Sequence, residues 1–191
     1  MNREFRIQKL KDQSGFTLIE MLVVVVILGI LAMIIVPQIS TSTSDAELRT
    51  MQTNLSTIRS AIEMYAAQHK NQYPGMRMED NSDAATTTAA QAKTAFLAQL
   101  TQFSNVKGEV STVKDTTNFP YGPYLQLGPN KLPENPFKTG SGVNPADVVI
   151  DIAEDDLSAA RAVSTADANA GWQFYLKLGI FFPNDTDHLK K

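Results

Sequence analysis

The chain has no cysteine in 191 residues, so no disulfide holds its fold together, and packing or a metal must do so. It has only two histidines, His69 and His188, and neither lies in a cluster spaced like a metal site or a catalytic triad. CxxC pairs, HExxH and glycine-rich phosphate loops are also missing. The sequence therefore predicts a protein that is not an enzyme. Because no basic run is present, nucleic acid is not an expected partner either.

What the chain does have is a long apolar run, MLVVVVILGILAMIIV, from Met21 to Val36. As a helix these residues span about 24 Å, short of the roughly 30 Å hydrocarbon layer of a membrane. Adding Phe16 to Glu20 closes the gap, but it places the Glu20 carboxylate inside the span. An unpaired charge there costs on the order of a few kcal/mol. The sequence thus predicts a membrane helix whose carboxylate needs a partner.

The charges before this run predict its orientation. Residues 1–15 hold four basic and two acidic side chains, a net charge of +2, and since the whole chain carries −3, the remainder carries −5. By the positive-inside rule the N-terminus stays in the cytoplasm while the long C-terminal part is translocated.

Three kinds of targeting segment fit these features. A secretory signal would be cut after the apolar run, near Ser40 to Ser42, but the run is slightly long and Glu20 interrupts its start. An uncleaved anchor would keep Glu20 just outside the lipid. In the third kind, cleavage falls before the apolar run, which the mature protein then retains.

The residues GFTLIE, from Gly15 to Glu20, carry a specific resemblance that favours the third kind. With a short basic leader before them and an apolar run behind, they resemble the processing site of type IV prepilins and type II secretion pseudopilins. The resemblance implies that a prepilin peptidase cuts after Gly15 and that the new amine on Phe16 is methylated. It also implies that Gly29 and Pro37 weaken the helix. The charge of Glu20 predicts a role in subunit assembly, where burial would pair its carboxylate with such an amine, and the alternative is a charge that only stabilises the helix start.

Beyond the apolar run, a narrow apolar stripe predicts that the helix continues to about His69, with a bend near Pro37. The stripe repeats at intervals of 3 and 4 residues, and either the C-terminal domain or a coiled coil could cover it. It consists of Leu48, Met51, Leu55, Ile58, Ile62 and Tyr65. The Pro74-Gly75 pair then stops the helix.

The rest of the chain predicts a small sheet domain. A short helical pattern carries Phe96 and Leu100, a proline-rich stretch from Phe119 predicts an ordered extended loop, and residues 147–152 predict a strand. Residues 171–185 alternate around a Lys177 to Gly179 turn and predict a hairpin. The fold class is therefore α+β, a long N-terminal helix packed by a small antiparallel sheet. Its parts are a leader (1–15), a transmembrane and assembly half of the helix (16–40), an amphipathic half (41–72) and a globular domain (73–191).

The segment GPYLQLGPNKLPENPF, residues 122–137, is similar to the stretch before the sheet in the major, G-type pseudopilins, with Asn135 in place of their usual acid. Those proteins bind calcium, so the resemblance makes calcium a candidate cofactor. The acidic residues between Asp147 and Asn169 supply suitable oxygen atoms, but they match no calcium loop position by position and equally fit a solvated acidic loop.

The sequence as a whole predicts a structural subunit of a type IV-type filament, most like a pseudopilin of type II secretion. The resemblance implies a helical homo-oligomer and, as partners, a prepilin peptidase, an assembly platform with its ATPase, and minor pseudopilins. It also implies a single pass through the bacterial inner membrane, with the C-terminal domain in the periplasm. Two alternatives remain open: the major pilin of a surface type IV pilus, and a membrane-tethered domain or enzyme that never polymerises.

Overall fold

The computed structural model describes residues 15–80, 82–156, 167–185 and 187, with the side chains of residues 34–42 left out. Its residues divide into two compact units, with the boundary between Ser44 and Asp45. The first helix, α1 (Leu18–Gln68), contributes to both units. Its bounds agree with the helix expected to end near His69, whereas the bend near Pro37 and the four-part division of the chain stay predictions.

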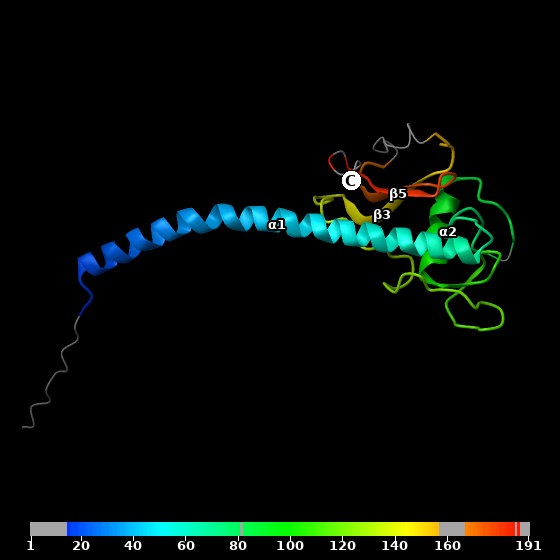
Figure 1. Ribbon diagram of the computed structural model, residues 1–191, viewed down its shortest axis with the longest axis horizontal. Helices are drawn as coiled ribbons and strands as arrows, with labels where there is room; N and C mark the ends of the chain where they lie inside the picture. Colours follow the sequence, from blue (N-terminus) through cyan, green and yellow to red (C-terminus); the bar gives the residue numbers. More distant parts are fainter. Residues whose placement is uncertain (1–14, 81, 157–166, 186, 188–191) are drawn as a thin grey trace, which may run out of the picture. The chain divides into compact units, whose positions relative to one another are not determined.

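The second unit adds one helix and two sheets to the C-terminal part of α1 (Figure 1). The helix α2 (Ala89–Thr101) is followed by two very short paired strands, β1 (Phe103–Ser104) and β2 (Val110–Ser111). The larger sheet has the order β3-β4-β5 and consists of β3 (Asn144–Asp151), β4 (Ala170–Tyr175) and β5 (Ile180–Pro183). The α+β fold class is confirmed.

The larger sheet is mixed and not purely antiparallel, which corrects the sequence prediction. β4 and β5 form the expected antiparallel hairpin, closed by a turn in which Gly179 has φ 67°. β3, however, runs parallel to β4, with Val148 beside Trp172 and Ile150 beside Phe174. Residues 152–169 join these two strands, and a connection of that length can cross over and return the chain in the same direction.

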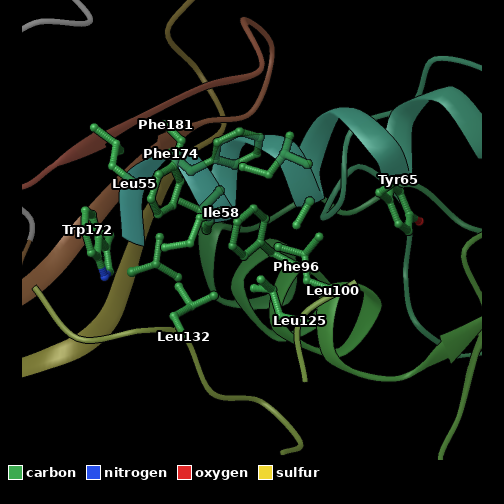
Figure 2. Close-up of a cluster of buried hydrophobic side chains, with 14 of the residues drawn as sticks. Leu55, Ile58, Tyr65, Phe96, Leu100, Leu125, Leu132, Trp172, Phe174 and Phe181 are labelled. Atoms are coloured by element: carbon green, nitrogen blue, oxygen red, sulfur yellow. The ribbon is translucent and has the colours of Figure 1, made fainter. Parts of the chain in front are cut away.

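The apolar stripe of α1 forms one wall of the hydrophobic core. Met51, Ile58, Ile62 and Tyr65 are at most 2% exposed, and side chains of α2 and the sheet cover them. Figure 2 shows Leu55 and Ile58 among Phe96, Phe174 and Phe181, while Tyr65 lies farther along the helix. The stripe is therefore covered by the chain's own C-terminal domain, as predicted, and the coiled-coil alternative is not needed to bury it.

Turn chemistry and hydrogen bonds hold the loops onto this core. Gly75 has φ 91°, and a Cβ there would lie 2.8 Å from the Ala92 carbonyl oxygen, so the close approach of this turn to α2 requires glycine. The buried Gln99 side chain accepts from the Gly75 N–H at 2.8 Å and donates to the Gly108 carbonyl at 2.8 Å. In the proline-rich loop, the Pro133 carbonyl accepts from Trp172 Nε1 at 2.8 Å. The loop is thus ordered and anchored.

Arg59 ties α1 to the outer edge of the sheet. Its Nε and Nη2 both donate to the Phe181 carbonyl, at 2.9 and 2.8 Å, and its guanidinium lies 5.5 Å from the centre of the Phe182 ring. Arg59 therefore attaches β5 to the helix.

Candidate functional site

The predicted processing site lies just before α1. Gly15 and Phe16 precede the helix and are exposed, Phe16 by 77%. Thr17 is the last residue before the helix, and its N–H and hydroxyl donate to Glu20 Oε2 at 2.8 and 2.7 Å. The Glu20 N–H donates back to Thr17 Oγ1 at 3.3 Å. These reciprocal bonds form a capping box, which satisfies backbone donors that a helix start leaves open.

Thr17 is a capping residue that the sequence prediction missed. The local signal was present, because Thr-x-x-Glu before an apolar run is the sequence pattern of a capping box. In the chain as described, both Thr17 donors reach the same carboxylate oxygen of Glu20, so this side chain has a local role besides any role between subunits. Pairing with the amine of another subunit stays a prediction.

The apolar run is exposed throughout its described part. From Leu18 to Met33 the large apolar side chains are between 46% and 90% exposed. A contiguous apolar surface of this extent on a protein marks a contact with lipid or with other protein. Over the described residues, no helix meets the length and hydropathy needed to cross a membrane.

The two residues expected to weaken the helix both lie within α1. A Cβ added at Gly29 would have nothing within 4 Å beyond the helix itself, so no packing contact requires glycine there. Pro37 lies within the helix bounds, but its side chain is outside the described residues. Their role in unwinding the segment between them stays a prediction.

The acidic residues considered for calcium mostly bind groups of their own chain. Asp147 forms an ion pair with Lys93 at 2.6 Å, and Asp151 Oδ1 accepts from the N–H groups of Ala153 and Glu154. Asp167 Oδ1 accepts from the Asn169 N–H at 3.1 Å. Within the described ranges, which omit residues 157–166, no group of three acidic or histidine side chains is arranged to hold a metal.

Comparison with known proteins identifies the N-terminal segment. Residues 10–36 match the family model described as the prokaryotic N-terminal methylation motif. Three curated relatives share the name type II secretion system core protein G. The chain is 47% identical to the Pseudomonas aeruginosa protein over 55 residues, 41% to the Vibrio cholerae protein over 58 and 40% to the Aeromonas hydrophila protein over 64.

These matches cover 29% to 34% of this chain and 39% to 44% of the relatives, so the chain spans about two fifths of the length of the curated relatives it matches. No solved structure matches the chain. The similarity lies in the N-terminal region, where the GFTLIE pattern was found. The chain thus carries the prokaryotic N-terminal methylation motif, and it resembles the type II secretion pseudopilins in its N-terminal region.

Proposed function

We propose that this chain is a structural subunit of the pseudopilus of a type II secretion system and has no catalytic activity. The observation that carries the proposal is the methylation motif at residues 10–36, together with the similarity of the N-terminal region to core protein G. The exposed apolar surface of α1 supports it, because a filament subunit needs such a surface to exchange lipid for neighbouring helices.

Processing is the first step of the proposed mechanism. A membrane peptidase cuts between Gly15 and Phe16, and the new Phe16 amine is methylated. Both residues are exposed and precede the first turn of α1, so a peptidase can reach this bond without unwinding the helix. The cut removes the basic leader but leaves the Thr17–Glu20 cap in place.

Assembly is the second step. The subunit waits in the bacterial inner membrane, held by residues 16–37, with its leader in the cytoplasm and its sheet domain in the periplasm. An assembly platform and its ATPase then move it into a helical fibre of identical subunits, which minor pseudopilins accompany. The fibre helps to drive substrates outward as a short piston or scaffold.

Mass analysis of the mature chain and the phenotype of a deletion strain test the proposal together. We expect a methylated N-terminal Phe16, and secreted proteins that remain in the periplasm of the deletion strain. A mature N-terminus at Met1 or near Ser42 would contradict the proposed processing. Correct processing with normal secretion but loss of long surface fibres would instead identify the subunit as a surface pilin.

A further inference from the structure

His69 lies directly after α1 in an enclosed aromatic site. It is 1% exposed, and its ring stacks on Tyr65 with the ring centres 3.7 Å apart and the planes 5° apart. The rings of Tyr121 and Tyr124 approach edge-on, with centres 5.3 and 6.3 Å away. An ionisable ring is thus held between the end of the helix and a loop more than fifty residues later in the chain.

The hydrogen bonds of His69 fix the tautomer of its neutral ring. Nδ1 lies 2.8 Å from the Tyr65 carbonyl oxygen, which only accepts, so Nδ1 carries the proton. Nε2 is then an acceptor, and the buried Ser104 hydroxyl, 3.2 Å away in β1, donates to it. The neutral ring therefore has a partner at each nitrogen, one from α1 and one from β1.

Through Ser104 the ring is connected to the segment of residues 103–124, here called the docked segment. Ser104 and Tyr121 exchange backbone hydrogen bonds of 2.9 and 3.1 Å, which close this segment on itself. At its end, the Tyr124 hydroxyl donates to Gln68 Oε1 at 2.6 Å. The docked segment is thus attached to Gln68, the last residue of α1, and to His69, which follows it.

The side chains that face His69 do not compensate a positive charge on it. The facing ionisable side chains are three tyrosines, and burial raises the pKa of Tyr65 and raises that of Tyr124 to about 12, so both stay neutral. Among the described residues, the cation Arg77 acts on Tyr65, and its charge would repel a second cation.

In the β1–β2 connection, Glu109 accepts from the Asn105 amide at 2.6 Å, and Lys107 lies 3.7 Å from Asp83. Neither contacts the His69 ring in the described part of the chain. Burial lowers the pKa of His69, and the backbone groups of Tyr65 and Asn105 oppose this only in part.

We propose that His69 is an acid-sensitive latch, whose neutral ring holds the docked segment on the end of α1 and whose protonation releases it. A proton from solvent binds the Nε2 lone pair, so the Ser104 hydroxyl can no longer donate to the ring and a cation is enclosed by neutral aromatic rings. Because the folded-state pKa lies below the unfolded value of about 6.5, the unfolded state binds more protons. The latch is intact above about pH 6.5 and weakens as the pH falls toward the folded-state pKa.

Hydrogen exchange of the full chain in detergent tests this inference, which does not depend on the proposed function. The reporters are the amides of Ser104 and Tyr121. The reference is the Leu176 amide, which is bonded to the Asp151 carbonyl at 2.8 Å. Between pH 7 and pH 5 we expect the protection factors of both reporters to fall several-fold relative to Leu176. Unchanged relative protection would overturn the proposal.

Two variants assign the effect to His69. His69→Gln should remove the pH dependence of reporter protection, whereas His188→Gln, at the only other histidine, should leave it unchanged. If His69→Gln does not fold, Ser104→Ala gives a second test. It removes the bond that favours the neutral ring, so the His69 titration followed by NMR should move up toward pH 6.5. A pH dependence that survives in His69→Gln, or a titration that does not move in Ser104→Ala, would contradict the latch.

Discussion

At the scale of a single residue, Glu20 has one observed role, in the helix cap, and one predicted role, in assembly, and the two can be separated. In the described chain its carboxylate caps α1 through Thr17, while the filament hypothesis requires its charge to meet the Phe16 amine of a neighbouring subunit. In that hypothesis, removing the Glu20 charge leaves a buried Phe16 amine without its partner, which is a larger penalty than losing a charge at an exposed helix start. Loss of the charge should therefore affect assembly more than it affects the helix.

We expect Glu20→Gln to be inserted and cleaved normally but to fail to enter fibres except beside wild-type subunits. Glutamine can still accept from Thr17 in a capping box, so this change removes the charge and keeps the cap. Thr17→Ala is the matched control, because it weakens the cap and keeps the charge. Fibre assembly measured by cross-linking and electron microscopy distinguishes them, and normal fibres from Glu20→Gln would exclude the pairing role.

Asn135 shows why an amide stands where the similar pseudopilin segment usually has an acid. The residue is fully buried, and its Nδ2 donates to the Gly171 carbonyl at 2.9 Å and lies 3.4 Å from Asp185 Oδ2. Gly171 is itself confined, since a Cβ there would lie 1.9 Å from the Pro145 carbonyl oxygen. A carboxylate at position 135 would face an acceptor and a second acid.

We expect Asn135→Asp to lower the free energy of unfolding by about 1 to 3 kcal/mol at pH 7, because the donor to Gly171 is lost. Burial should raise the pKa of the new carboxyl group, so the loss should be small below its unfolded value of about 3.9 and should grow as pH rises through the folded-state pKa. Urea denaturation at several pH values measures this. Asn130→Asp, at an exposed site, should have almost no effect, and equal effects of the two changes would argue against the burial account.

At the scale of the element, α1 from Leu48 onward has one buried and one exposed face. Ile58 is fully buried in the core, while Met64, less than two turns away, is 56% exposed. Removing a buried side chain costs transfer free energy and leaves a cavity, whereas removing an exposed one does neither.

We expect Ile58→Ala to lower the free energy of unfolding by about 2 to 5 kcal/mol and Met64→Ala to change it by less than about 0.5 kcal/mol. Chemical denaturation of both variants gives the comparison. If another subunit were needed to cover the stripe, the cost of Ile58→Ala would depend on protein concentration. A loss that is the same at all concentrations supports burial within the single chain.

At the scale of the whole molecule, the second unit contains its own core. The buried cluster and the side chains packed on it lie between Leu48 and Phe181, within the unit that begins at Asp45. The exposed apolar surface from Leu18 to Met33 belongs to the first unit. The buried core and the exposed apolar surface thus belong to different parts of the chain.

We therefore expect residues 45–191, expressed alone, to fold as a monomer with near-native circular dichroism and a cooperative thermal transition. Analytical ultracentrifugation would show whether the fragment is a monomer, and the chemical-shift dispersion of its NMR spectrum would show whether it is folded. A fragment that stays unfolded until residues 16–44 are restored would show that the core depends on the first unit. The same fragment with Ile58→Ala should melt at a lower temperature, which confirms that the transition reports the core.

Local patterns in the sequence determined the helix, its buried stripe, the β4–β5 hairpin and the position of the processing motif. Each depends on residues a few positions apart, as in the 3 and 4 spacing before Tyr65 or the turn at Gly179. The Thr17–Glu20 cap belongs to the same class, since its signal was also local. The tertiary structure alone decided the parallel pairing of β3 with β4, because the alternation of side chains in a strand does not record the direction of its partner. It also decided that His69 meets Ser104, 35 positions later, since such contacts depend on how the chain packs.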